Sequence, residues 1–245
     1  MTAFINALRE NAPPPNPKDY PSVADQFPSL NSSAAINAYL AVFRKTKINR
    51  FSKIDIETSL KKRLVHPESI FQGHTSLCGP AAFFYALVTK RADLYVRYVL
   101  DIAMYGKTAI SIKGKGHPAL IVNVPTQLLN TCSGINIVDW LTLATLRNAD
   151  NPVLGLSCQW SLLNDLASIT QPETLASWFR RIGCREVVVK TQRLGTLGLN
   201  NLIEAQQRYT RNHSVCLLLQ AKVFKTPLQL PLLYPNHWVN LTSNI

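Results

Sequence analysis

The sequence predicts an α+β fold, because helical patterns come first along the chain and strand patterns come late. Apolar residues recur at helical spacing in several stretches between residues 32 and 147. Runs rich in valine and leucine at 185–190 and 214–224, and a short one beginning at His237, are typical of strands. We therefore expect a helical part that packs on a late antiparallel sheet.

The length and composition are those of a folded globular protein. The 245 residues allow one large domain or two small ones. With 47% hydrophobic and 16% charged residues, the chain is too apolar to be disordered, and no apolar run is long enough for a membrane span. An odd number of cysteines, five, without a CxxC pair indicates reduced thiols. We expect four of them to be buried small hydrophobes: Cys132, Cys158, Cys184 and Cys216.

The chain divides into three predicted parts. Residues 1–31 are rich in proline, which predicts an extended leader. Residues 32–70 are interpreted as a helical N-terminal extension that packs against the domain after it, residues 71–245. The first ten residues lack a basic region followed by an apolar one, so no ordinary signal peptide is visible.

Local patterns predict the individual elements. Ser32 and Ser33 can cap the first helix, Asp93 a later one, and the capping box Thr170–Glu173 another. In chain order, we expect helices at 32–50, 53–64, 78–91, 93–103, 137–147, 170–183 and 199–211, and strands at 109–112, 185–190, 214–224 and from His237 onward. The Gly- and Lys-rich stretch 113–116 is a plain turn, because it lacks the spacing of a phosphate-binding loop.

The segment around Cys78 carries the clearest chemical signal. Cys78 stands between a loop of small residues and the apolar run 81–88, and Pro80 suits the first turn of a helix. A cysteine at that position lies at the positive end of the helix dipole, which favours the thiolate. Gln72 supplies an amide donor six residues upstream. A thiolate and a nearby amide donor are the nucleophile and oxyanion-stabilising group that acyl transfer requires.

Two motifs resemble those of papain-like cysteine peptidases. The pattern Gln-x5-Cys-Gly-Pro-Ala is similar to the nucleophile segment of that superfamily, especially in peptidase domains that trim bacteriocin leaders. His237-Trp238-Val239 is similar to the start of its histidine-bearing strand. The resemblance implies a papain-like fold for residues 71–245 and hydrolysis of a peptide or amide bond. It also implies Cys78 as nucleophile, His237 as its base and Gln72 as part of the oxyanion hole, without a cofactor or metal.

The third catalytic residue of that superfamily has no clear counterpart. It is an Asp or Asn that comes about fifteen residues after the histidine, whereas the sequence given ends eight positions after His237. We expect the native chain to extend further; the alternatives are another orienting residue or none. Asn240 and Asn244 are too close to His237 to match. Without a counterpart for the third residue, the chain could also be a non-enzymatic interaction module on the same fold. The Cys–His pair equally suits a deamidase or acyltransferase.

The stretch from Asp139-Trp140 to Arg147-Asn148 resembles a segment of papain-fold toxin domains in bacterial effectors. This resemblance implies a protein that is cytoplasmic in its producer or exported by a dedicated secretion system. A cognate inhibitor protein is then the expected partner, beside a protein or peptide substrate.

The net charge of +12 is not concentrated in a nucleic-acid-binding pattern. Basic residues are scattered, and no stripe of them alternates with aromatic residues. We therefore expect a solvated basic surface, with an acidic substrate or partner and no nucleic acid. The remaining histidines show no i,i+4 pair or carboxylate pattern for a metal, and we expect them to be polar surface residues: His66, His74, His117 and His213.

Overall fold

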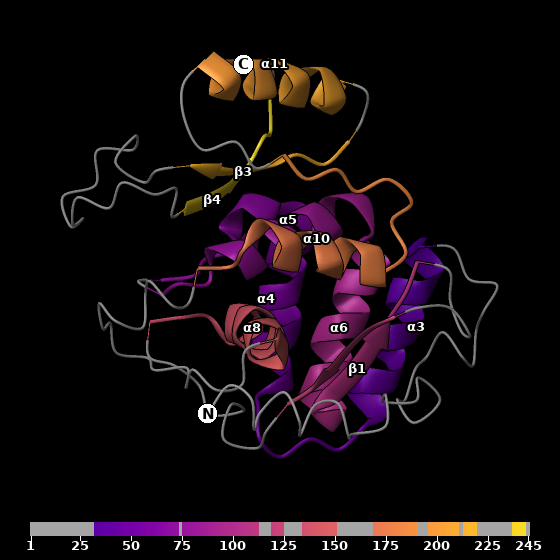
Figure 1. Cartoon of the computed structure of the whole chain (residues 1–245). Helices are drawn as coiled ribbons and strands as arrows, with labels where there is room; N and C mark the ends of the chain where they lie inside the picture. The colour runs from indigo at the N-terminus through magenta and orange to yellow at the C-terminus, as the bar shows by residue number, and fades with distance from the viewer. Residues whose placement is uncertain are drawn as a thin grey trace, which may run out of the picture.

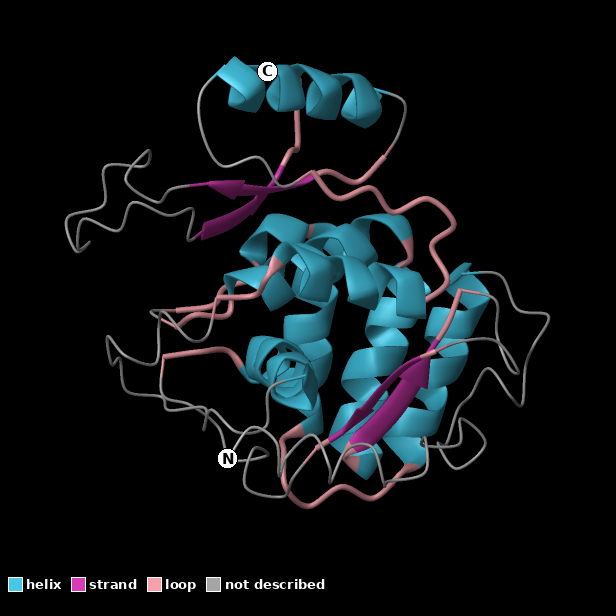
Figure 2. Ribbon diagram, in the orientation of Figure 1, coloured by secondary structure: helices cyan, strands magenta, loops and turns pink. Residues whose placement is uncertain are grey.

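The computed structural model of the chain describes residues 32–73, 75–112, 119–124, 134–150, 169–190, 196–210, 213–219 and 237–243. Over these residues it consists of helices and two small antiparallel sheets (Figures 1 and 2). The predicted α+β class is therefore confirmed. The predicted leader, the stretch 113–116, His74, His117, Cys132, Cys158 and Asn244 lie outside the described residues.

The first helices that the structure describes are α3 (Ser32–Lys45), α4 (Lys53–Val65), α5 (Cys78–Lys90) and α6 (Ala92–Tyr105). Helix α6 is buried along almost its whole length, and its charged residues Asp93, Arg97 and Asp101 are buried together with its apolar ones. It contacts α3, α4 and α5, and α10 (Pro172–Arg181) packs on α5 (Figure 1). The predicted helices at 53–64 and 78–91 are confirmed, whereas the first helix ends at Lys45 rather than near Arg50.

The N-terminal helices share one hydrophobic core with the rest of the fold. Phe43 of α3 and Ile56 of α4 are fully buried in the same cluster as Phe83 and Phe84 of α5. That cluster crosses the boundary predicted at residue 70, and the division of the chain stays a prediction. Helix α5, which carries Cys78, therefore rests on a core to which residues 32–65 contribute.

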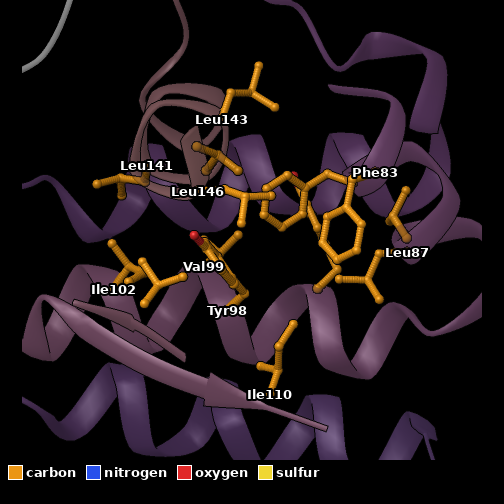
Figure 3. Packing of buried hydrophobic residues seen from close by; sticks show 14 of the residues in the cluster. Phe83, Leu87, Tyr98, Val99, Ile102, Ile110, Leu141, Leu143 and Leu146 are labelled. Atoms are coloured by element: carbon orange, nitrogen blue, oxygen red, sulfur yellow. The ribbon is translucent and has the colours of Figure 1, made fainter. Parts of the chain in front are cut away.

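The predicted helix 137–147 is confirmed and contains a π-helical segment. It comprises α7 (Ile137–Asp139), the π segment η4 (Trp140–Ala144) and α8 (Thr145–Asp150). Thr142 and Thr145 donate hydroxyl hydrogen bonds to carbonyls three and four residues earlier, which is common where helices deviate from α geometry. Figure 3 shows its leucines in one buried cluster with residues of α5 and α6: Leu141, Leu143 and Leu146 together with Phe83, Leu87, Tyr98, Val99 and Ile102.

Each sheet has two strands. β1 (Lys107–Ile110) pairs with β2 (Leu120–Asn123) in antiparallel register, with Ile110 opposite Leu120. β3 (Cys216–Leu219) pairs with β4 (His237–Asn240), with Leu219 opposite His237 and Cys216 opposite Asn240. Figure 1 shows the β3–β4 hairpin between α5 and α11 (Thr196–Thr210). The second hairpin therefore carries the strand predicted to begin at His237.

The predicted strand 185–190 is wrong. These residues pair with no described strand, and Val188 is 47% exposed. A valine run has strand propensity, but a strand also needs a partner that supplies its hydrogen bonds. The same stretch is instead held through side chains, because Glu186 accepts from Arg208 of α11 and Lys190 lies 3.2 Å from Glu204.

Two predicted helix caps are also wrong. Asp93 lies inside the first turn of α6 and accepts two hydrogen bonds from the guanidinium of Arg91, of 2.9 and 2.7 Å. The N-cap of α10 is Gln171, without a side-chain capping bond, so Thr170 and Glu173 form no capping box. Thr170 is buried in a tertiary contact, and this contact, not the local capping pattern, determines its position.

Candidate active site

Cys78 is the first residue of α5, as the sequence predicts. Leu77 occupies the N-cap without a side-chain bond to the helix end, and Pro80 lies in the first turn. This position is the positive end of the helix dipole, which favours a negative charge on sulfur. Cys78 is 5% exposed, so only a small part of the residue is open to solvent.

His237 is the first residue of β4, also as predicted. It is partly buried, and this burial lowers the pKa of its imidazole. Burial acts in this direction because it disfavours the charged form of the ring. A neutral imidazole is the form that can accept a proton from a thiol.

Thr170 contacts two residues that are next in sequence to the predicted catalytic residues Cys78 and His237. The indole Nε1 of Trp238 donates a 2.8 Å hydrogen bond to the backbone carbonyl of Thr170. The side chain of Thr170 lies so close to Gly79 that a Cβ there would overlap its Oγ1 and Cβ atoms. The residue after Cys78 and the residue after His237 are therefore linked through one buried threonine.

A second contact fixes the direction in which β4 runs along α5. Asn240 Nδ2 donates a 3.2 Å hydrogen bond to the backbone carbonyl of Ala82. β4 and α5 therefore run in the same direction: Trp238 lies nearest Gly79, and Asn240 lies beside Ala82. Residues 238 and 240 lie about 7 Å apart along a strand and residues 79 and 82 about 5 Å apart along a helix, so both contacts fit one continuous packing of β4 on α5. The two contacts place the start of β4 at the start of α5.

Gln72 lies on the loop before α5, after the short 3₁₀ helix η2 (Pro67–Ser69). Its backbone carbonyl accepts a 2.6 Å hydrogen bond from Thr75 Oγ1, and Gly73 adopts a left-handed backbone with φ of 64°. These features turn the chain sharply just after Gln72. Its side-chain oxygen is buried without a hydrogen-bond partner among the described residues, so this oxygen does not hold the amide in another contact.

A buried ion pair that sequence reasoning missed holds this loop. Asp139 accepts hydrogen bonds of 2.9 and 2.6 Å from the guanidinium of Arg63, and both side chains are buried. The same carboxylate accepts a 3.1 Å bond from the backbone N–H of Phe71, next to Gln72. The only sequence signal was a lone acidic residue in an apolar run, and nothing in it pointed to Arg63.

The other described cysteines are poor candidates for a nucleophile. Cys216 donates a 3.1 Å hydrogen bond to Asn240 Oδ1, and burial raises the pKa of its thiol to about 12. Burial also raises the pKa of Cys184. Both residues are partly buried, and both pack against the hydrophobic core. Asn240 is engaged with Cys216 and Ala82, so its side chain fastens the hairpin to α5.

The described histidines outside β4 contact glutamate side chains and a backbone carbonyl. His66 lies 3.0 Å from a carboxylate oxygen of Glu68, and His213 contacts the backbone carbonyl of Arg208. Within the part of the chain that the structure describes, no three or more His, Cys, Asp or Glu side chains cluster as a metal site would require.

A cavity of about 480 Å³ lies at the other end of α5 from Cys78. The lining residues come from the second half of α5, from the end of α11 and from the Cys216–Asn240 end of the β3–β4 ladder. Tyr85, the first lining residue of α5, is seven positions after Cys78, which corresponds to about 10 Å along a helix. This cavity is therefore separate from the first turn of α5.

Comparison with protein-family models, with curated proteins and with solved structures finds no match for this chain. Among the described helices, none is long and apolar enough to cross a membrane.

Proposed function

We propose that this protein is a thiol-dependent hydrolase of the papain-like type, with Cys78 and His237 as its catalytic pair. The observation that carries the proposal is the packing of β4 on α5, through Trp238–Thr170 and Asn240–Ala82, which brings the start of the strand to the start of the helix. Cysteine at a helix start and histidine at a strand start are the arrangement that the two sequence motifs imply. A papain-like fold for the catalytic part belongs to the same proposal.

The proposed reaction proceeds in two halves. His237 accepts the thiol proton of Cys78, and the thiolate forms a bond to the carbonyl carbon of the substrate. The Gln72 amide and the Cys78 backbone N–H donate to the oxyanion of the tetrahedral intermediate. The intermediate collapses, the C–N bond breaks, and the amine leaves with the proton from His237. Water then attacks the thioester, with His237 again as base, and releases the carboxylic acid and the free thiol.

Peptide-bond cleavage is the outcome we propose, because the two motifs resemble peptidases. Deamidation of a side-chain amide and transfer of the acyl group to another nucleophile would use the same pair. These outcomes differ in what leaves the tetrahedral intermediate and in what attacks the thioester. They share every step through Cys78, so one test of the nucleophile covers all three.

Alkylation with iodoacetamide at pH 7, read residue by residue by mass spectrometry, tests the nucleophile. We expect Cys78 to react at least tenfold faster than Cys184 and Cys216, whose thiol pKa values are raised by burial. The Cys78→Ala variant should lose hydrolysis of p-nitrophenyl acetate, whereas Cys184→Ala, the matched control, should keep it. Equal alkylation rates for the three thiols, or full hydrolysis by Cys78→Ala, would overturn the proposal.

The second candidate function is a non-enzymatic interaction module. The cavity at the far end of α5 favours it, because this cavity lies away from Cys78. In this case the hairpin and α11 present a binding surface, and Cys78 is a buried core residue. The module predicts ligand binding that Cys78→Ala leaves unchanged, together with slow alkylation of Cys78.

We further propose a bacterial effector context, with export by a dedicated secretion system and a cognate inhibitor protein as partner. The resemblance of residues 139–148 to toxin domains supports this context. Expression of the wild-type chain in a bacterial host should slow growth more than expression of Cys78→Ala at the same protein level. Equal growth, with the protein directed to the cytoplasm and to the periplasm in turn, would contradict it.

A further inference from the structure

The cavity at the second half of α5 is built from three parts of the chain. Tyr85 belongs to α5, Tyr209 to the last turn of α11, and Ser214 and Thr242 lie just beyond one end of the β3–β4 ladder. Its volume of about 480 Å³ is within the range of small-ligand sites. The Tyr209 hydroxyl donates a 2.6 Å hydrogen bond to the Thr242 carbonyl and so ties the α11 wall to the hairpin wall.

Two tyrosine rings give the cavity its aromatic surface. Tyr85 and Tyr209 are both partly exposed, and the phenol of Tyr209 is near enough to act electrostatically on that of Tyr85. Grooves lined by aromatic rings are the sites at which proteins hold proline-rich segments in the polyproline II conformation. Such a segment makes no internal hydrogen bonds, so its carbonyls need donors. The hydroxyl groups of Tyr85, Ser214 and Thr242 are donors of this kind.

The charges around the cavity favour a ligand without a net charge. Burial raises the pKa of the Tyr85 phenol, and the charge of Glu68 raises it further. Lys90 lines the cavity but already interacts with another part of the fold. His213, also in the lining, lies 3.6 Å from a carboxylate oxygen of Glu186. Groups of both signs therefore act at this site, and recognition is left to the aromatic rings and the hydroxyl groups.

The chain itself contains an uncharged proline-rich segment. Residues 11–17 read Asn-Ala-Pro-Pro-Pro-Asn-Pro and belong to the predicted leader, outside the described residues. Pro14 and Pro17 have the P-x-x-P spacing of segments that bind aromatic grooves. A proline run favours polyproline II before it binds, so little conformational entropy is lost on docking. The segment thus matches the cavity in its rings, its carbonyls and its lack of charge.

The chain between this segment and the fold is long enough to reach the cavity. Fifteen residues separate Pro17 from Ser32, the first residue of α3, and they can span about 50 Å. A compact chain of 245 residues has a radius of gyration of only about 18 Å. In Figure 1 the loop 46–52 joins the lower ends of α3 and α4, whereas α5 lies across the top. The start of α3 is therefore at the α5 end of the fold.

We propose that the cavity is a docking site for the proline-rich segment 11–17 of the same chain, with its proline rings against Tyr85 and Tyr209. The tether gives the segment a high effective concentration at the site, so moderate contacts are enough to hold it. The docking does not depend on the chemistry proposed for Cys78. It gives the predicted leader a defined attachment point on the second half of α5.

Fluorescence anisotropy with the full chain tests the proposal. The probe is a fluorescein-labelled, otherwise blocked peptide with the sequence of residues 11–17, and its control peptide has serine in place of the four prolines. Wild type is compared with a leader variant, in which the cavity has lost its own ligand. The leader variant is Pro13→Ser/Pro14→Ser/Pro15→Ser/Pro17→Ser.

Three further substitutions are made within the leader variant. Tyr209→Ala removes one aromatic wall, whereas Tyr209→Phe keeps the ring and removes only the hydroxyl that bonds to Thr242. Tyr105→Ala is the matched control, because this tyrosine is 41% exposed at the end of α6 and does not line the cavity. Urea denaturation of each variant checks that the fold is kept.

We expect the leader variant to bind the proline peptide saturably, and wild type to bind it at least tenfold more weakly, because the tethered segment competes. Tyr105→Ala and Tyr209→Phe should keep the binding, and Tyr209→Ala should weaken it at least tenfold. The serine peptide should bind at least tenfold more weakly than the proline peptide. Light scattering should give wild type and the leader variant the same oligomeric state.

Equal binding of the proline peptide by wild type and the leader variant would overturn the proposal, because the cavity would then accept proline-rich partners but not its own segment. Absence of binding to the leader variant, or equal losses in Tyr105→Ala and Tyr209→Ala, would also overturn it. A dimer of wild type that the leader variant does not form would mean that the segment docks on a second copy. That result too would overturn docking within one chain.

Discussion

Trp238 and Thr170 are joined by a buried hydrogen bond from the indole Nε1 to a backbone carbonyl, although 68 residues separate them. The Thr170 side chain also occupies the place that a Cβ of residue 79 would take, so the bond connects the strand of His237 to the helix of Cys78. An indole N–H that is buried usually has such a partner, since leaving it unpaired is costly. The proposed catalytic pair thus depends on a residue with no chemical role of its own.

Gly79→Ala tests the close approach of α5 to Thr170. A methyl group at this position overlaps the Thr170 side chain, so either α5 or the 169–171 segment must move. We expect a loss of about 1–3 kcal/mol in the free energy of unfolding, measured by urea denaturation, as for other overpacked sites. Hydrolysis of p-nitrophenyl acetate should fall as well, because the Trp238 contact moves with Thr170.

A second substitution separates this effect from a general intolerance of alanine. Thr170→Gly removes all three side-chain atoms that the new methyl group overlaps, so the double variant should recover part of the lost stability. Thr170→Ser keeps its Cβ and Oγ atoms and should not rescue Gly79→Ala. Equal behaviour of the two double variants would show that the contact at Gly79 is not the cause.

Burial of His237 predicts a pH dependence of stability. The pKa of this imidazole is lower in the folded protein than the unfolded value of about 6.5, so the unfolded chain binds more protons as the pH falls. The stabilising contribution is complete above about pH 6.5 and is lost as the pH falls through the folded pKa. Urea denaturation between pH 5 and 8 should show a steeper acid loss for the wild type than for His237→Gln. Parallel curves for the two proteins would contradict this expectation.

Local signals in the sequence predicted the positions of Cys78 and His237, but not the contacts that join their elements. The start of α5 is indicated by an apolar run with Pro80 in its first turn, and β4 by a short run of strand-forming residues. Both signals lie within a few residues of the element they predict. The packing of β4 on α5 instead depends on Thr170, which the sequence suggested as a helix cap.

The predictions from sequence that were wrong, and the ion pair that they missed, have one physical cause. The valines at 187–189 favour a strand, but no described strand lies beside them. Aspartate is a residue type that often caps helices, yet the carboxylate of Asp93 is bound by Arg91. Arg63 and Asp139 are 76 residues apart, and although Asp139 stands in an apolar run, nothing in the sequence pairs it with Arg63. Propensity and periodicity describe a segment alone, whereas these residues are placed by partners that are distant in sequence.

Asp139 is expected to act as a positioning residue for the proposed oxyanion hole. Its carboxylate holds the backbone N–H of Phe71, directly before Gln72, while Arg63 neutralises its charge. Asp139→Ala leaves the Arg63 guanidinium buried and unpaired, which should lower the free energy of unfolding by roughly 3–5 kcal/mol. Glu57→Gln, which breaks the surface pair with Arg44, is the matched control and should cost less than about 1 kcal/mol.

The double variant Arg63→Met/Asp139→Leu separates positioning from stability. Replacing a buried ion pair with apolar residues of similar size is often neutral or stabilising, so urea denaturation should show most of the stability restored. The bond to Phe71 is still absent, and the Gln72 loop has lost its attachment to α7. We therefore expect p-nitrophenyl acetate hydrolysis to stay at least tenfold low, while Cys78 alkylation, which forms no oxyanion, stays near the wild-type rate. Gln72→Ala should show the same split. Normal hydrolysis by the stable double variant would mean that Asp139 contributes to the fold alone.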